Sequence, residues 1–243
     1  MVLSERFARN GEVSIHYYDS NNEADDRLVP IVVCPGLSET AEEYLDFIAA
    51  AAPRRCILLS FRGRGKSDTP EAGYDLKDHL SDLEAVVRDS NVKSFHLFAY
   101  SRGVSYALEY AHTYPANVRS IIVGDYPLEH RMMPDGWAED YIHHYLIPYN
   151  RTSNIRPATV WGIQRESTQI LLDRPLRLPI MVARGRLEGS LITDEDVVRY
   201  KRMHESVTVK EYARSGHALK GEDRMLFYSD IAWFADEQDG RKE

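Results

Sequence analysis

A serine near the middle of the chain stands where nucleophilic chemistry could be built. Ser101 follows the apolar run 94–100 and precedes 102–114, whose apolar residues recur at helical spacing, so the sequence predicts a strand, a sharp turn and a helix. The small residues Ala99 and Gly103 flank the serine and allow neighbouring backbone to approach closely. A serine on such a turn can attack a carbonyl carbon. Taken alone, Ser101 fits equally well as a helix N-cap.

A serine hydroxyl is a weak nucleophile without a general base, and the chain offers one downstream. His217 follows Ser215-Gly216 after a predicted strand, and two carboxylates, Asp125 and Glu188, follow two other predicted strands. The carboxyl ends of parallel strands meet at one edge of a sheet, where open α/β sheets bind their ligands. Each residue alone is explained as a helix cap, a loop residue or an exposed acid. Together they indicate a Ser-acid-His site.

The turn 99–103 and the order Ser101, acid, His217 resemble the α/β-hydrolase family, and the match spans nearly the whole chain. The resemblance implies that His217 takes the proton of Ser101 and that a carboxylate orients the imidazole. Three departures are visible: Ala99 replaces the usual first glycine of the turn, Pro35 replaces a histidine, and Ser60 replaces an aspartate.

The resemblance also implies an acid and an oxyanion hole. The family's acid turn reads Gly-x-x-Asp, which Gly185 to Glu188 matches with glutamate, so Glu188 is favoured as the acid. Asp125 is the alternative, because some members supply the acid from that strand end. The backbone N–H groups of Leu37 and Arg102 are the expected oxyanion donors, and neither residue is proline.

The glycine-rich loop 62–67 has a second interpretation, a phosphate-binding P-loop. A P-loop requires a glycine at position 60, where this chain has Ser60, and a helix should start at once, yet Pro70 and Gly73 intervene. The loop instead resembles the Asp-x-Arg-Gly-x-Gly-x-Ser turn of α/β-hydrolases, and this resemblance implies a structural loop in which Arg62 and Ser67 fix the turn beside the serine.

The fold predicted to position these residues is a doubly wound, mostly parallel α/β sheet. Residues 1–125 and 179–243 are expected to form this core, and the resemblance implies that 126–178, with helices near 135–146 and 158–172, form a small helical cap. Trp137, Tyr141 and Tyr145 recur every four residues on one helix face. Core packing explains most such aromatics; a pocket lined by Trp137, Tyr141 and Trp161 is the sharper hypothesis.

Basic residues also follow several predicted strands, and a positive field at the pocket mouth would favour an anionic substrate. Solvated or structural side chains are the simpler explanation. The set comprises Arg62, Arg64, Lys66, Arg102, Arg184 and Arg186.

Composition narrows the class of protein. A hydrophobic fraction of 43% supports a sizeable core, and a net charge of −8 argues against nucleic acid as a partner. No secretory signal or membrane span is evident, and Cys34 and Cys56 are poor material for a disulfide framework or a metal site. We expect a cytoplasmic protein with a small-molecule substrate and no cofactor or metal; the sequence is silent on oligomeric state.

The predicted function is hydrolysis of a small carboxylic ester, thioester or lactone through an acyl-enzyme on Ser101, as in a carboxylesterase. Carbon–carbon bond or amide hydrolysis by the same triad remains open. So does a ligand-binding or regulatory protein on the same fold, because fold does not dictate function. Haloalkane dehalogenation is disfavoured, because that chemistry uses a carboxylate where this chain has Ser101.

Overall fold

The protein is built around one eight-stranded sheet with the strand order β1-β2-β4-β3-β5-β6-β9-β10. The computed structural model describes residues 3–240. β1 and β2 form an antiparallel hairpin, β2 pairs antiparallel with β4, and all other neighbours are parallel. The strands are β1 (Ser4–Asn10), β2 (Val13–Asp19), β3 (Ile31–Cys34), β4 (Cys56–Leu59), β5 (Phe95–Tyr100), β6 (Val118–Gly124), β9 (Ile180–Gly185) and β10 (Val207–Tyr212).

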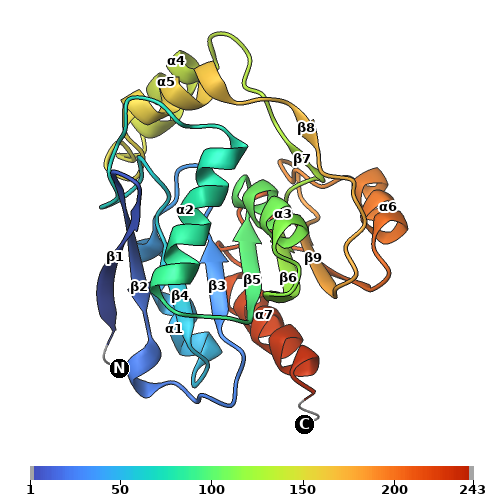
Figure 1. The fold of residues 1–243 in the computed structure, drawn as a ribbon. Helices are drawn as coiled ribbons and strands as arrows, with labels where there is room; N and C mark the ends of the chain where they lie inside the picture. Colours follow the sequence, from blue (N-terminus) through green and yellow to red (C-terminus); the bar gives the residue numbers. More distant parts are fainter. Residues whose placement is uncertain (1–2, 241–243) are drawn as a thin grey trace.

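Helices cover both faces of this sheet (Figure 1). One face carries α2 (Leu76–Asp89), α3 (Gly103–Thr113) and α6 (Asp194–Met203), and the other carries α1 (Leu45–Ala51) and α7 (Arg224–Gln238). The central strands are continuous apolar runs because both of their faces are buried. In β3, Val32 and Cys34 join one apolar cluster while Ile31 and Val33 join the other. The doubly wound, mostly parallel sheet predicted from the sequence is therefore confirmed.

The proposed cap, residues 126–178, lies beyond the carboxyl ends of the parallel strands (Figure 1). It contains β7 (Glu129–His130) paired with β8 (Ile170–Leu171), α4 (Trp137–Tyr141), the π-helical turn η3 (Ile142–Leu146) and α5 (Pro157–Glu166). Besides its helices, the segment holds the short β7–β8 pair, which is only partly buried. One expectation needs correction. The helix predicted over 158–172 ends at Glu166, where the chain turns extended to reach β8.

The helix predicted from Thr40 begins as a 3-10 turn, η2 (Ala41–Tyr44), and continues as α1. Thr40 and Glu43 form the expected capping box. A further 3-10 turn, η1 (Asn21–Glu23), follows β2.

The loop after β4 joins the core to the proposed cap. The Gly65 N–H donates to the Asn154 carbonyl at 2.9 Å, and the Arg156 N–H donates to the Gly63 carbonyl at 3.1 Å. Gly63 has φ +75°, and a Cβ there would lie 2.0 Å from the Thr159 Oγ1. The loop is thus an anchoring turn, with a conformation that only glycine fits at position 63.

Two side chains fix this turn, as expected. The Arg62 guanidinium donates to both carboxylate oxygens of Asp82, at 2.9 and 2.7 Å. The Ser67 hydroxyl donates to the Ser60 carbonyl at 2.6 Å, and the Ser60 hydroxyl accepts from the Ala41 N–H at 2.9 Å. Ser60, which stands where the resemblance has an aspartate, therefore still holds neighbouring backbone.

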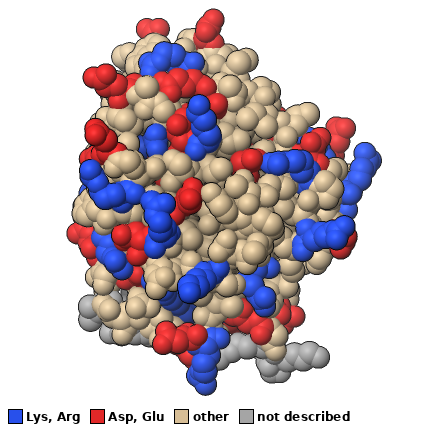
Figure 2. Space-filling model, in the orientation of Figure 1, with Lys and Arg blue, Asp and Glu red and all other residues tan. Residues whose placement is uncertain are grey.

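Charged side chains of both signs are mixed over the face shown in Figure 2, without one continuous basic patch. Within residues 3–240 no helix is long and apolar enough to cross a membrane. Cys34 and Cys56 are buried free thiols, and burial raises the pKa of Cys56 to about 12.

Candidate functional site

Ser101 occupies the tight turn between β5 and α3. Its φ is +50°, a left-handed conformation that costs a serine energy and that clusters at functional sites. The turn is held by the Ser101 N–H, which donates to the Gly124 carbonyl at 2.8 Å. A Cβ at Gly103 would lie 2.4 Å from the carbonyl oxygens of Cys34 and Pro35, so only glycine allows α3 to begin this close to β3.

Three side chains form one hydrogen-bonded chain at the carboxyl edge of the sheet. The His217 Nε2 lies 3.0 Å from the Ser101 Oγ, and the His217 Nδ1 lies 2.8 Å from the Asp125 Oδ2. Asp125 comes from the residue after β6 and His217 from the loop after β10. This geometry allows the imidazole to take the serine proton while the carboxylate stabilises the imidazolium that forms.

Asp125 is fully buried, and its carboxylate is satisfied on several sides. Besides His217, it accepts a hydrogen bond from the Ser190 hydroxyl at 2.6 Å and another from the Leu191 N–H at 2.9 Å. Its own N–H donates to the Ala183 carbonyl at 2.9 Å, and its φ is +49°. These bonds hold the carboxylate in place beside the imidazole.

The preference for Glu188 over Asp125 is corrected by this arrangement. Glu188 is exposed, and the carboxylate that contacts His217 is that of Asp125. The Gly-x-x-acid turn instead supports the histidine loop through its backbone: the Leu187 N–H donates to the Ser215 carbonyl at 3.0 Å. A Cβ at Gly216 would lie 2.2 Å from the Glu188 carbonyl oxygen. The motif therefore marks a loop conformation rather than the position of the acid.

The backbone N–H groups of Leu37 and Arg102 are the candidate oxyanion donors. Gly36 packs against the serine, since a Cβ there would lie 3.1 Å from the Ser101 Cβ, and Leu37 follows it. Arg102 precedes the first residue of α3, where the helix dipole adds partial positive charge. Within residues 3–240, neither the Leu37 N–H nor the Arg102 N–H donates a hydrogen bond, so both are free for a ligand oxygen.

A cavity of about 370 Å³ opens onto Ser101 and His217. Tyrosines, hydroxyls and small residues make up most of its wall. The lining residues are Gly36, Leu37, Ser38, Glu39, Tyr100, Ser101, Tyr141, Tyr145, His217 and Ala218.

Of the three predicted pocket residues, only Tyr141 lines this cavity. Its hydroxyl lies 2.9 Å from the Ser38 Oγ. Trp137 stands behind it, with the two rings stacked at a centroid distance of 5.2 Å. Trp161 is 44% exposed on the outer side of α5, where it lines a separate cavity of about 650 Å³. The prediction of Trp161 was therefore wrong, because α5 turns a different face towards the core.

The aromatic face of α4 and η3 extends as a stack towards solvent. Ring centroids are separated by 5.2 Å from Trp137 to Tyr141, 5.0 Å from Tyr141 to Tyr145 and 5.4 Å from Tyr145 to Tyr149. Residues four apart lie on the same helix face, so the rings form one row. Tyr145 could have been found from its spacing to Tyr141; Tyr100, which precedes Ser101 in a buried strand, had no such signal.

The basic residues at strand ends do not surround the serine: none of the six lines the cavity described above. Arg62 pairs with Asp82, Lys66 with Glu5, and Arg184 with Glu211. Arg186 is exposed beside Arg184. The hypothesis of a positive pocket mouth built from these side chains is therefore wrong.

Two of these arginines are buried close to the turn. Arg64 donates to the Leu37 carbonyl at 3.0 Å, and Arg102 donates to the Ser167 hydroxyl at 2.7 Å. Burial and the Arg102 charge lower the pKa of His130 to about 3, so His130 stays neutral and can accept from that guanidinium.

Metal-ligating side chains do not cluster in the part of the chain that the structure describes. No group of three or more His, Cys, Asp or Glu residues within 3–240 could hold a metal ion. His143 and His144, adjacent on η3, are both exposed.

Comparison with known proteins places this geometry in context. A model of the alpha/beta hydrolase fold matches residues 29–141. Over 121 residues the chain is 31% identical to a cis-3-alkyl-4-alkyloxetan-2-one decarboxylase from Shewanella oneidensis, a match that covers 48% of this chain and 36% of that protein. Over 70 residues it is 33% identical to a 2-(acetamidomethylene)succinate hydrolase from Mesorhizobium japonicum, covering 29% and 25% of the two chains. These matches therefore span well under half of either relative.

Among solved structures, Est816, an enzyme that degrades N-acyl homoserine lactones, superposes with a TM-score of 0.77 at 18% identity. The superposition covers 94% of this chain and 100% of the other. At this identity the likeness concerns the fold.

Proposed function

Because this chain belongs to the α/β-hydrolase superfamily, we propose that it is a serine hydrolase that cleaves a small carboxylic ester, thioester or lactone through an acyl-enzyme on Ser101. The observation that carries the proposal is the unbroken chain of hydrogen bonds from Asp125 through His217 to Ser101. The two free N–H groups beside the serine add the second requirement of acyl transfer.

In the first half-reaction, the His217 Nε2 accepts the serine proton while the Ser101 Oγ attacks the carbonyl carbon. The carbonyl oxygen becomes an oxyanion between the N–H groups of Leu37 and Arg102. His217 then delivers its proton to the leaving alcohol or thiol as the carbon–oxygen or carbon–sulfur bond breaks.

In the second half-reaction, water loses a proton to His217 and attacks the acyl carbon, and the proton returns to the Ser101 Oγ as the acid is released. Asp125 fixes the imidazole tautomer with the proton on Nδ1 during both steps and stays ionised. With a lactone, the leaving alcohol remains tethered to the acyl group until water releases the ring-opened hydroxy acid.

The cavity supports a compact substrate. About 370 Å³ is near the lower end of typical ligand cavities, and three of the lining residues are tyrosines while only one, Leu37, is a large aliphatic residue. Two of the similar proteins have a cyclic ester in their names: the oxetan-2-one decarboxylase and the enzyme that degrades homoserine lactones. Lactones therefore belong in the panel of substrates to be tested.

The test is hydrolysis of 4-nitrophenyl acetate together with labelling by a fluorophosphonate, with Ser101→Ala as the control. We expect a burst of nitrophenol followed by turnover, and covalent labelling that the Ser101→Ala variant loses. A small lactone and a matched amide then define which bond is cleaved.

Tight binding of ligands without turnover or labelling would contradict the hydrolase proposal and support a binding protein on this fold. Hydrolysis that survives Ser101→Ala would contradict the acyl-enzyme.

A further inference from the structure

The carboxylate of Glu39 holds the turn that carries Leu37. The Glu39 Oε2 accepts from the Gly36 N–H at 2.8 Å and from the Tyr44 hydroxyl at 2.5 Å. Because Gly36 packs on Ser101, Glu39 thereby fixes the backbone immediately before the Leu37 N–H. The orientation of one candidate oxyanion donor thus depends on this side chain.

The loop that carries His217 contacts the same carboxylate through Lys220. Three residues after the histidine, the Lys220 Nζ lies 2.6 Å from the Glu39 Oε1. The ammonium also lies 3.7 Å from the centre of the Tyr44 ring and 5.1 Å from that of Tyr100, within reach of cation–π attraction. One ion pair therefore joins two loops that are about 180 residues apart in the chain.

Tyr100 makes a second connection between the turn 99–103 and the histidine loop. Its hydroxyl donates to the His217 carbonyl and accepts from the Leu219 N–H, the latter at 3.2 Å. Its ring is stacked on the His217 imidazole at a centroid distance of 5.4 Å. Burial, followed by the charge of Glu39, raises the pKa of Tyr100, so the phenol stays protonated as a donor.

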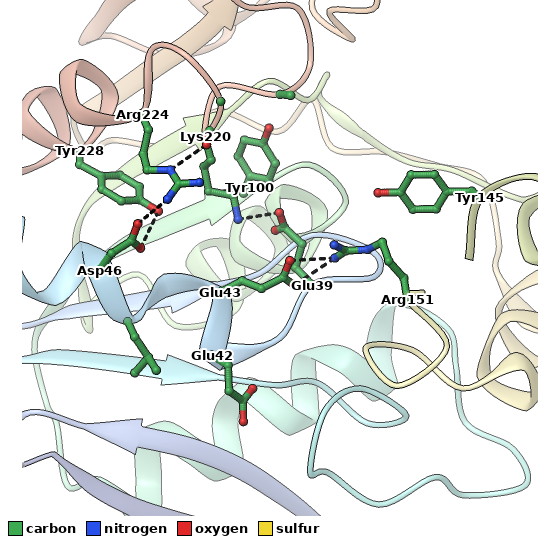
Figure 3. A pocket seen from close by; sticks show the side chains of 13 residues that line it. Glu39, Glu42, Glu43, Asp46, Tyr100, Tyr145, Arg151, Lys220, Arg224 and Tyr228 are labelled. Atoms are coloured by element: carbon green, nitrogen blue, oxygen red, sulfur yellow. Dashed lines mark hydrogen bonds and ion pairs between the residues drawn. The ribbon is translucent and has the colours of Figure 1, made fainter. Parts of the chain in front are cut away.

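The pair lies between two cavities. Glu39, Tyr100, Tyr145 and Ala218 line both the cavity at Ser101 and an adjoining one of about 590 Å³ that Lys220 also lines (Figure 3). Figure 3 shows Lys220 directed at Glu39 in this wall. The two side chains are only 14% and 15% exposed, so their attraction is screened less than that of a surface pair.

We propose that Glu39 and Lys220 are positioning residues, which hold the oxyanion turn and the histidine loop at the separation that acyl transfer on Ser101 requires. The proposal rests on the proposed hydrolase function. It concerns transition-state geometry: the pair touches neither the nucleophile nor the imidazole, and it acts through Gly36 and the loop 217–220.

Three variants test it: Glu39→Gln, Lys220→Met and the double variant, assayed on 4-nitrophenyl acetate. Each single change removes the ion pair while keeping the shape of the side chain. We expect each to lower kcat by about 10- to 100-fold, the range seen when catalytic groups are displaced by about 1 Å, with KM changed less than about twofold. The double variant should have the kcat of the poorer single variant, because both remove the same interaction.

Lys210→Met is the matched control. Lys210 pairs with Asp230 at 2.8 Å, and neither residue lines the cavity at Ser101 or the adjoining one, so this variant removes an ion pair away from both loops. Its kcat should match that of the unchanged protein. Lys220→Arg should recover part of the activity that Lys220→Met loses.

Unchanged kcat in Glu39→Gln and Lys220→Met, with activity still abolished in Ser101→Ala, would overturn the positioning role and leave the hydrolase proposal standing. Multiplicative losses in the double variant, or a fall in kcat that only accompanies a lower melting temperature, would also overturn it. If the unchanged protein shows neither turnover nor labelling, the hydrolase proposal fails first.

Discussion

The ends of β6 and β9 offer an internal comparison, because each is followed by a carboxylate. The strands are parallel neighbours, with Gly124 opposite Ala183, so both acids leave the sheet at the same edge. Asp125 is one residue past its strand, fully buried and bonded to His217. Glu188 is three residues past its own and exposed, although the turn that carries it matches the commoner sequence motif.

The difference teaches that a motif can describe backbone packing rather than side-chain chemistry. A Cβ at Gly185 would lie 2.1 Å from the Gly216 carbonyl oxygen, so the glycine is needed for the two loops to touch. At the end of β6 the side chain matters instead of close backbone packing: Asp125 adopts φ +49°, and its side chain turns inward. The loop of β9 supports the histidine, whereas the end of β6 supplies the carboxylate.

The strongest test of the difference between Asp125 and Glu188 is to neutralise each acid in turn. Asp125→Asn should lower kcat by about 10⁴-fold, since an amide cannot hold the imidazole in the required tautomer. Glu188→Gln should stay within about twofold, because its side chain meets solvent. The measurement is kcat on 4-nitrophenyl acetate. A collapse of turnover in Glu188→Gln alone would restore the acid that the motif favours.

A methyl group at Gly216 tests the backbone role of the β9 turn. Gly216→Ala places a Cβ 2.2 Å from the Glu188 carbonyl oxygen, so one loop must move and carry His217 with it. We expect kcat to fall by about 10- to 100-fold. Gly189→Ala is the control: its φ of +91° is strained for alanine, but a Cβ there meets nothing within 4 Å. That variant should lose stability and keep most of its kcat; equal losses of kcat would remove the special role of the 188–216 contact.

Ser190 allows a finer test of how the Asp125 carboxylate is held. Ser190→Ala removes a hydroxyl that donates to the Asp125 Oδ1 at 2.6 Å. Hydrogen bonds to charged groups contribute about 1.5–3 kcal/mol, so we expect a loss in that range in the free energy of unfolding, measured by urea denaturation. A neutral outcome would show that the Leu191 N–H and His217 suffice to satisfy the carboxylate.

Glu39 extends the comparison to a third carboxylate, here through the pH dependence of stability rather than through turnover. Although burial alone would raise the pKa of Glu39, the Lys220 charge and the hydrogen bonds from Lys220, Tyr44 and Gly36 hold it below its ordinary value. A depressed pKa means that the folded protein prefers the ionised form, so this contribution is present at neutral pH and is lost as pH falls through the folded-state pKa.

Urea denaturation of the unchanged protein and of Glu39→Gln should therefore give stabilities that differ at pH 7 and converge on acidification. A difference that is constant down to pH 3 would show that Glu39 is held by contacts that do not need its charge.

Much of this architecture could be predicted from the sequence because it depends on patterns with a fixed period. Apolar runs predicted the central strands, and Ser101 between Ala99 and Gly103 predicted the tight turn. Whether a side chain just beyond a strand end is buried or exposed follows no such periodic pattern. Asp125 and Glu188 differ in φ and in burial, and neither can be read from residue type.

The cavity wall was hard to predict for a related reason. Helical spacing placed Trp137, Tyr141 and Tyr145 on one face, but which ring reaches the cavity depends on the π-helical turn and on how the proposed cap packs. Trp161 is an aromatic residue of the kind that lines pockets, but it lies on another surface, and residue type alone does not show this.

The ring stack of α4 also makes the protein's own fluorescence informative. The chain has three tryptophans, and Trp161 and Trp233 are both at least 40% exposed and do not line the cavity at Ser101. Trp137 is stacked at 19° on Tyr141, whose ring forms part of that cavity's wall. A molecule that enters beside Ser101 and contacts Tyr141 should alter the emission of the indole stacked on it, so occupancy can be followed optically, without a chromogenic substrate or a chemical label.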